Sequence, residues 1–429
     1  MRAQTGFAAR TASAGLVAAL AALGAAAPSH ATMASAGGMA EAAALRTVSL
    51  PDMGPDGEWW FTAWQIPKVW QAGARGQGVT VAVIDTGVQA DWPELSGVVL
   101  PGTDFQGGDG RVDRSQELAG DNHGHGTAMA IDIAGQGGPS GLVGVAPQAK
   151  ILPVQRSNTD PGVGEQIRWA VNHGAKVINM SYYVGGPCSD DDQAAVLYAF
   201  DHGAVVVTAA GNDGATTERG IGRPTDCLGV LNVTAIDNQL RVWAKADRGA
   251  FVSVAAPGVH IQAVTLARER AHSDGTSDSA ALTSGAIALV WSKYPQLTNR
   301  QVVARLLATT RDLGAPGKDD LYGYGGIRPY QAITTDVPTT AANPIFDQLP
   351  PMTTSSAGVI NPGDTTSAQS GTSSTAGTGT STSTLLVLAA GIGLLVVVAV
   401  IVVAVVIGRS RRDRQVGPPP GSYVRRWPQ

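Results

Sequence analysis

The chain has 429 residues, of which 15% are charged, and its formal net charge at pH 7 is −4. This length allows one large domain with additional segments at its ends. The small negative charge gives no indication of nucleic-acid binding, which relies on basic patches that neutralise phosphates.

The N-terminus has the features of a secretory signal peptide. Arg2 and Arg10 precede or border an Ala- and Leu-rich stretch at 12–27, and Ser29-His30-Ala31 follows as a small-x-small cleavage site. A buried helix is the alternative, but the length and the flanking residues favour a signal peptide at residues 1–31. Residues 32–58 then form a short extension before the main domain.

The middle of the chain alternates predicted strands with predicted helices. Apolar, β-branched runs predict strands at 79–84, 151–154, 177–180, 204–209, 229–235 and 251–255. Helices are predicted at 164–173, 194–202, 279–294 and 298–309, the last with Thr298 as its N-cap. Strands that alternate with helices of this length favour an α/β fold with a mostly parallel sheet covered on both faces.

Asp85 ends the first of these strands. The run at 79–84 is typical of a buried parallel strand, and ligands of open α/β sheets bind at the carboxyl ends of such strands. A carboxylate at that edge can orient an imidazole. The alternative is an aspartate that only begins a turn.

Two histidines lie in a glycine-rich turn that precedes a helix. The turn reads DNHGHGTA at 121–128 and contains His123 and His125. Its glycines allow the backbone to approach another segment closely. Taken alone, either histidine is an ordinary surface or core residue.

Ser277 lies in the polar run SDGTSDSAA at 273–281, which opens onto a long apolar stretch. A serine on such a bend exposes its hydroxyl, and its N–H is among the unpaired amides of a helix start, which suits a nucleophile beside an oxyanion site. A helix N-cap is the alternative. The chain order Asp85, His125, Ser277 is that of subtilisin, and three such signals in this order are hard to explain by chance.

Seven segments between Trp64 and Ile333 together resemble the subtilisin-like serine protease family, the subtilases. They read VAVIDTGV at 81–88, HGTA at 125–128, GLVGVAPQAKI at 141–151, VINMS at 177–181, VVVTAAGND at 205–213, VAAPGVHI at 254–261 and GTS at 275–277. The resemblance implies a three-layer subtilisin-like fold and hydrolysis of peptide bonds in polypeptide substrates.

The resemblance also implies a role for each of the three polar residues. Ser277 matches the nucleophile, His125 the general base and then acid, and Asp85 the carboxylate that orients the imidazole. An imidazole suits the role of base because its pKa lies near working pH. His125 is favoured over His123 because the family's histidine directly precedes Gly-Thr.

Further site residues follow from the same resemblance. Asn212 matches the family's side-chain donor to the oxyanion, although Gly-Asn after a strand is also a common turn. Ser181 and Tyr182 fall on the family's substrate-binding strand, where Tyr182 and Tyr183 are bulkier than the usual small residues. We therefore expect access to the cleft to be narrowed.

The chain contains two cysteines, Cys188 and Cys227. In an oxidising compartment, a disulfide between them is favoured over two free thiols. Nothing around them indicates a metal site. Subtilases often bind calcium, and the loop from Asp104 to Asp121 offers oxygen ligands, but no spacing there defines a calcium site.

The C-terminal part of the chain predicts a membrane anchor. After the peptidase domain at 59–335, residues 336–384 are rich in Pro, Ser, Thr and Gly and read as a linker. Residues 385–408 are apolar and long enough to form one transmembrane helix. Four arginines begin the tail at 409–429, so the positive-inside rule predicts a cytoplasmic tail and an extracytoplasmic catalytic domain at the cell membrane.

Within the subtilases, the chain most resembles the mycosins, the membrane-anchored proteases associated with type VII secretion. The likeness rests on the signal peptide, the short N-terminal extension rich in Trp, the paired cysteines, the linker and the single predicted span. It implies a type VII secretion membrane complex as a partner. The extension at 32–58 is too short for the folded inhibitory propeptide of other subtilases.

Two residues depart from the subtilase pattern after the nucleophile. Asp278 follows Ser277 directly, and Ala281 stands where many subtilases carry a proline. A carboxylate at a helix start favours folding, but it should oppose the negative charge of a nearby oxyanion. The departures leave two alternatives open: a weakly active or inactive scaffold of a secretion complex, and a peptide-binding module without chemistry.

Overall fold

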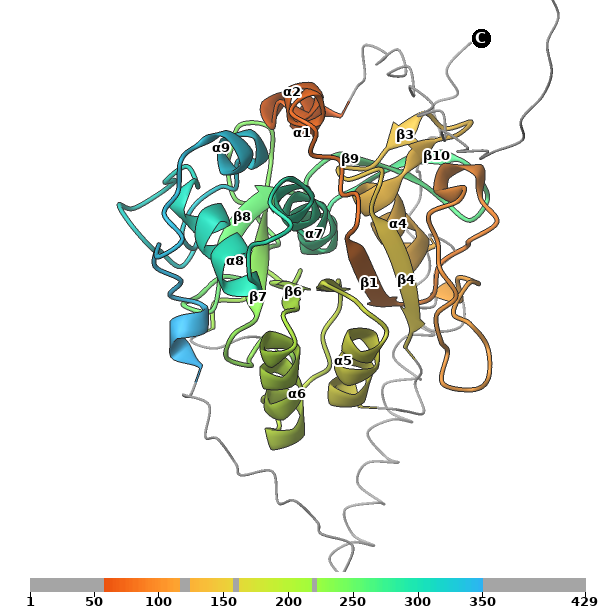
Figure 1. Cartoon of the computed structure of the whole chain (residues 1–429), viewed down its shortest axis with the longest axis horizontal. Helices are drawn as coiled ribbons and strands as arrows, with labels where there is room; N and C mark the ends of the chain where they lie inside the picture. The colour runs from red at the N-terminus through yellow and green to blue at the C-terminus, as the bar shows by residue number, and fades with distance from the viewer. Residues whose placement is uncertain (1–57, 116–123, 157–161, 218–221, 350–429) are drawn as a thin grey trace, which may run out of the picture. The chain divides into compact units, whose positions relative to one another are not determined.

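Six parallel strands form the central sheet of the computed structural model, which describes residues 58–115, 124–156, 162–217 and 222–349. Their order across the sheet is β4-β1-β5-β6-β7-β8 (Figure 1). The strands are β1 (Thr80–Asp85), β4 (Lys150–Gln155), β5 (Val177–Met180), β6 (Val205–Ala209), β7 (Leu231–Ile236) and β8 (Val254–Pro257). Each corresponds to a predicted strand, and the predicted α/β class with a parallel sheet is confirmed.

Helices cover both faces of this sheet. Figure 1 shows α5 (Val163–Asn172) and α6 (Asp190–Asp201) on one side, with α4 (His125–Ala134) and α7 (Thr276–Lys293) on the other. The side chains of β1 alternate between two apolar clusters, as those of a strand must. Val81 and Val83 pack on the side of α4 and α7, whereas Ala82 and Ile84 pack on the side of α5 and α6. This double burial explains the unbroken apolar run of the strand.

The direction in which the chain winds reverses at β1. From β1 the chain passes through α4 to β4 on one side, and it returns through α5 to β5 on the other side of β1. In open α/β sheets the crevice for ligands forms at such a switch point, beyond the carboxyl ends of the strands. Asp85 is the last residue of β1, and Ser181 directly follows β5.

Helix α7 runs through the middle of the molecule, and every residue from Thr276 to Trp291 is buried. Small residues allow its neighbours to come close: a Cβ on Gly285 would lie 2.8 Å from the Cβ of Val145. The helix begins at Thr276, three residues before the predicted start at 279. Ser277 therefore lies within its first turn.

Two short helices that the sequence pattern did not predict begin the described chain. They are α1 (Trp59–Ala63) and α2 (Ile66–Gln71). Trp60, Trp64 and Trp70 are buried, and the Trp70 indole N–H donates to the Val145 carbonyl oxygen at 3.0 Å. These tryptophans cover apolar surface of the domain, which is why the Trp-rich segment folds onto it.

At its other end, the packed domain continues beyond residue 335, the predicted end of the peptidase domain. After α8 (Asn299–Ala308) and α9 (Pro329–Thr334), Ile345 and Phe346 are buried in the core cluster. The Asn343 side chain donates to the Arg300 carbonyl oxygen at 2.9 Å. Asn343, Ile345 and Phe346 thus pack with the peptidase domain, whereas residues 338–340 are exposed.

Several predicted segments lie outside the described residues: the signal peptide, nearly all of the extension, the rest of the linker, the membrane span and the tail. Within 58–349, excluding its three gaps, no helix combines the length and the apolar character that a membrane span needs.

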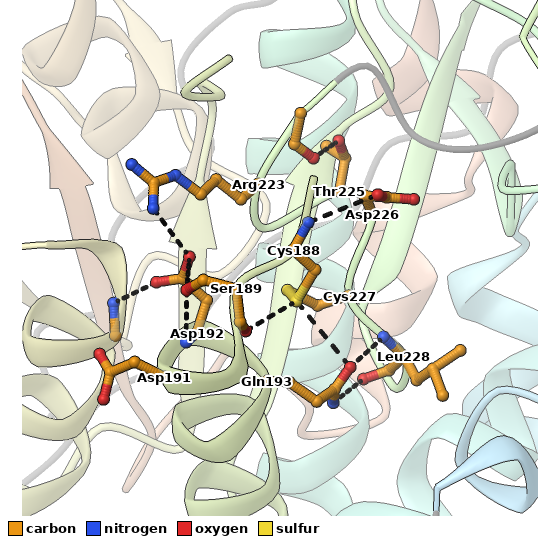
Figure 2. Close-up of a disulfide and its surroundings, with 12 residues drawn as sticks. Cys188, Ser189, Asp191, Asp192, Gln193, Arg223, Thr225, Asp226, Cys227 and Leu228 are labelled. Carbon is orange, nitrogen blue, oxygen red and sulfur yellow. Dashed lines mark hydrogen bonds and ion pairs between the residues drawn. A yellow bond between two sulfur atoms is a disulfide. The ribbon is translucent and has the colours of Figure 1, made fainter. Parts of the chain in front are cut away.

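A disulfide joins Cys188 to Cys227 and connects the start of α6 to the segment that leads into β7 (Figure 2). Gln193 secures the same junction, because its amide donates to the Leu228 carbonyl oxygen and accepts from the Leu228 N–H. Nearby, Val184 and Arg223 exchange backbone hydrogen bonds. The disulfide therefore braces the segment that runs on from Ser181.

We expect the double variant Cys188→Ser, Cys227→Ser to lose stability. The disulfide joins residues with a sequence separation of 39. In the chain-entropy model, a disulfide that closes a loop of that length raises the free energy of unfolding by roughly 3–4 kcal/mol. Urea unfolding of the protein in a Ser277→Ala background, which prevents self-digestion, measures the difference. As a control, the disulfide of the parent protein is reduced, which should lower the urea midpoint as the double variant does. Equal urea midpoints for the oxidised parent, the reduced parent and the double variant would contradict the expectation.

Candidate active site

Asp85 and His125 form a hydrogen-bonded pair at the carboxyl edge of the sheet. Asp85 is 1% exposed, and its Oδ1 accepts from the Thr86 N–H at 2.7 Å and from His125 Nδ1 at 2.8 Å. Because an ionised carboxylate only accepts hydrogen bonds, Nδ1 carries the proton. In the neutral imidazole this leaves Nε2 as the basic nitrogen.

Glycines allow α4 to begin this close to the end of β1. A Cβ on Gly126 would lie 2.2 Å from the carbonyl oxygen of Gly87. Gly87 itself has φ +99°, and a Cβ there would lie 2.1 Å from the carbonyl oxygen of Val112. Neither position has space for a larger residue.

Charges around the pair favour its ionised form. Burial alone would raise the pKa of Asp85, but the charge and hydrogen bond of His125, with the charge of Arg156, hold that pKa below its ordinary value. Burial opposes protonation of His125, yet neighbouring carboxylates, above all Asp85, raise its pKa to about 9. At neutral pH the resting imidazole is therefore mostly protonated.

Ser277 lies in the first turn of α7 and is 8% exposed. Its hydroxyl donates to the Ser181 carbonyl oxygen at 3.0 Å, and the Ser181 hydroxyl donates to the Ser277 carbonyl oxygen at 2.9 Å. Asn179 donates in turn to the Ser181 hydroxyl at 3.0 Å. In this conformation the Ser277 hydroxyl pairs with Ser181 rather than with His125.

Asn212 is held by the residue that precedes Ser277. Its amide oxygen accepts from the Thr276 N–H at 3.0 Å and from the Thr276 hydroxyl at 2.8 Å. Since an N–H can only donate, these bonds fix the orientation of the amide. The structure gives its Nδ2 no partner among the described residues, and Nδ2 lies 3.9 Å from where a Cβ on Gly275 would be.

Asp278 is buried directly behind Ser277. One of its carboxylate oxygens accepts from the Ser273 hydroxyl at 2.8 Å. Burial raises its pKa to about 6, although that hydrogen bond and the charge of His125 act in the opposite direction. The Asp278 charge also contributes to the raised pKa of His125. Ala281, the other departure, is fully buried within α7.

The two tyrosines after Ser181 point in different directions. Successive side chains of an extended segment alternate, so Tyr182 lies with Met180 on the α5 side, and its hydroxyl donates to Gln166 at 2.6 Å. Of the two bulky tyrosines that the sequence predicts to narrow the cleft, Tyr182 therefore packs its side chain toward α5. Tyr183 is 38% exposed instead, and its hydroxyl donates to Asp213, next to Asn212, at 3.1 Å.

The other histidine of the glycine-rich turn and the loop with oxygen ligands complete the predicted site residues. His123 lies outside the described residues. Among the residues that the structure describes, no group of three or more His, Cys, Asp and Glu side chains is arranged to hold a metal ion. In the loop that offered oxygen ligands, Asp104 accepts hydrogen bonds from the Gln106 and Gly108 N–H groups of its own turn.

Comparisons with known proteins identify the family to which the described domain is similar. Residues 76–325 match the subtilase family. Subtilisin DY from Bacillus licheniformis is 35% identical over 265 residues, which cover 60% of this chain and 91% of that protein.

The chain is also similar to solved structures of proteases. The chain is similar to the MycP3 protease from the type VII (ESX-3) secretion system, with a TM-score of 0.55, 34% identity, and coverage of 67% of this chain and 91% of that one. It is also similar to MycP1 from Mycobacterium smegmatis, with a TM-score of 0.55, 30% identity, and coverage of 68% and 89%.

We expect Asp278→Asn to lower the pKa of His125 from its value of about 9. Removal of a neighbouring negative charge disfavours the imidazolium, and Asp278, with a pKa of about 6, is ionised throughout the range in which His125 titrates. An NMR titration of protein labelled with ¹⁵N-histidine measures the pKa. Asp91→Asn, at an exposed carboxylate, is the control. An unchanged titration in Asp278→Asn would show that this carboxylate does not act on His125.

Proposed function

Because the chain belongs to the subtilase family of serine endopeptidases, we propose that Asp85, His125 and Ser277 form its catalytic triad. The observation that carries the proposal is the 2.8 Å hydrogen bond between Asp85 and His125 at the switch point of the sheet. The reciprocal hydrogen bonds between Ser277 and Ser181 support it further, because they tie the start of α7 to the end of the neighbouring strand.

In this mechanism, the Ser277 hydroxyl turns from the Ser181 carbonyl oxygen toward Nε2 of neutral His125. His125 takes the proton as Ser277 Oγ attacks the carbonyl carbon of the substrate, and it then gives the proton to the leaving amine. Asp85 keeps the Nδ1–H in place and stabilises the imidazolium. Water then attacks the acyl-enzyme: His125 takes a proton from the water and gives it to Ser277 Oγ as the acyl group leaves. Apo hydrogen bonds in such sites commonly tighten only when substrate binds.

We propose that Asn212 and the backbone N–H of Ser277 stabilise the oxyanion. The amide orientation imposed by Thr276 leaves Asn212 Nδ2 for this role, and Ser277 contributes an amide from the first turn of α7. Asp278 opposes catalysis in two ways. Its negative charge disfavours the oxyanion, and it keeps His125 protonated, so that the imidazole is less available as a base. We therefore propose an enzyme whose kcat/KM rises into the alkaline range.

We also propose that the enzyme is anchored in the cell membrane with its catalytic domain outside, where it processes substrates of a type VII secretion system or stabilises that system. The apolar run at 385–408 and the arginines after it support the anchor. The likeness to MycP3, a protease of the ESX-3 secretion system, supports the secretion role.

A serine-directed fluorophosphonate tests the chemistry. We expect it to label the full-length protein and to leave Ser277→Ala unlabelled, because Ser277 is the residue it would modify. Ser292→Ala, at the far end of α7, is the matched control and should keep the label. An unlabelled parent protein would favour the scaffold alternative, and secretion that survives in a Ser277→Ala strain would separate assembly from cleavage.

Removal of the predicted span tests the anchor. We expect a chain that stops at residue 384 to appear in the soluble fraction of the producing bacterium, whereas the full-length chain stays with the membranes after a carbonate wash. The control is a full-length chain with Ser277→Ala, which should fractionate like the parent. Equal membrane retention of the truncated and full-length chains would rule out this anchor.

A further inference from the structure

A carboxylate outside the proposed triad contacts Thr86, which follows Asp85, and Thr127, which lies two residues after His125. Asp113 is 8% exposed and belongs to a loop that runs along the residues after β1. Backbone hydrogen bonds join this loop to them, from the Val88 N–H to the Gly110 carbonyl oxygen at 3.0 Å and from the Arg114 N–H to the Thr86 carbonyl oxygen at 2.8 Å.

The Asp113 carboxylate accepts five hydrogen bonds from three residues. Oδ1 accepts from the Thr86 hydroxyl at 2.8 Å, the Ser115 N–H at 3.0 Å and the Ser115 hydroxyl at 2.6 Å. Oδ2 accepts from the Thr127 N–H at 2.8 Å and the Thr127 hydroxyl at 2.5 Å. Both oxygens are therefore fully engaged.

Two of these three donor residues, Ser115 and Thr86, also hold the backbone at or beside a triad residue. The Ser115 hydroxyl accepts from the His125 N–H at 2.7 Å. The Thr86 hydroxyl accepts from the Gly126 N–H at 3.0 Å, and Thr86 directly follows Asp85. Asp113 thus connects the end of β1 with the first turn of α4 through hydrogen bonds alone.

We propose that Asp113 is a positioning residue that sets the His125 imidazole against Asp85 by fixing the first turn of α4 on the end of β1. The inference rests on the proposed function, since it assigns Asp113 a part in the same triad. Asp113 contacts neither the imidazole nor Ser277 in the hydrogen bonds described, so it acts through Thr86, Ser115 and Thr127.

The bonding pattern requires a carboxylate rather than an amide. Oδ1 faces the backbone N–H of Ser115, and Oδ2 faces that of Thr127. An asparagine would have to direct its NH₂ group at one of these N–H donors, whichever way it turned. One buried backbone donor would then lose its acceptor, and the first turn of α4 would shift to find another.

Charge provides a second, separable effect. The carboxylates that act on His125 are Asp85 from β1, Asp278 from α7 and Asp113 from its loop. Loss of the Asp113 charge should lower the pKa of His125, as for any neighbouring anion. Substitution of a residue elsewhere in the loop that has only a structural role should change neither the pKa of His125 nor its Nδ1 hydrogen bond.

The test compares Asp113→Asn with Asp109→Asn, an exposed aspartate of the same loop, in the full-length protein. We expect Asp113→Asn to lower kcat roughly 10²-fold, as small misplacements of a catalytic group do, with little change in KM, and Asp109→Asn to match the parent. In ¹⁵N-histidine protein carrying Ser277→Ala, Asp113→Asn should weaken the Nδ1 proton signal of His125 and lower its pKa. An unchanged signal, pKa and kcat would overturn the proposal.

A second pair of variants applies where Asp113→Asn does not fold. Thr86→Ser keeps the hydroxyl that bridges Asp113 and the Gly126 N–H, whereas Thr86→Val removes it. We expect Thr86→Val to lower kcat and to weaken the Nδ1 proton signal of His125. We expect Thr86→Ser to keep the kcat and the Nδ1 signal of the parent. Equal behaviour of the two would overturn the proposal. An unlabelled parent in the fluorophosphonate assay would refute the triad instead, and the NMR comparison would still decide whether Asp113 positions His125.

Discussion

The hydrogen bond between Asp85 and His125 joins two elements that are 40 residues apart in sequence, and much of the surrounding structure serves to make it possible. A buried carboxylate is costly unless it is paired and hydrogen-bonded. Asp85 has both forms of compensation, from the Thr86 N–H and from His125. The glycine at 126 is needed because only a backbone without a Cβ atom can bring the start of α4 this close to the end of β1.

Helix α7 brings the third residue of the proposed triad to the same edge. Its interior is made of small and aliphatic residues, so it can lie against the sheet over most of its length. A buried polar chain passes from Ser284 through Asn179 to Ser181, which is bonded to Ser277. The location of Ser277 is therefore set by the packing of the core as well as by its own turn.

Several buried carboxyl groups act on one another around Asp278. Asp278 acts on His125, and burial raises the pKa of Glu58 to about 8 and that of Asp132 well above its ordinary value, with the Asp278 charge raising both further. Glu58 is the first described residue, and its carboxylate accepts from the Gln262 N–H at 2.9 Å. The charge of Asp278, the residue beside the nucleophile, thus acts on Glu58 at the start of the described residues.

Some features of the site could be predicted from sequence because they are local. A β-branched run fixes a strand and the location of Asp85 at its end, and the GTS motif before an apolar stretch places Ser277 at a helix start. The direction of Tyr182 was not predicted, because it depends on the register of a segment that continues β5. The role of Asp113 had no local signal, since an aspartate in a polar loop resembles many others.

The sequence by itself determined the order of the six central strands along the chain, the family likeness and the residue types of the proposed triad, because periodicity and short motifs are carried by neighbouring residues. Only the tertiary structure decided which polar side chains share hydrogen bonds. Asp113 and Thr127, Asn179 and Ser284, and Thr276 and Asn212 meet through the folding of separate segments onto one sheet edge. Such contacts depend on distances in space that no stretch of sequence specifies on its own.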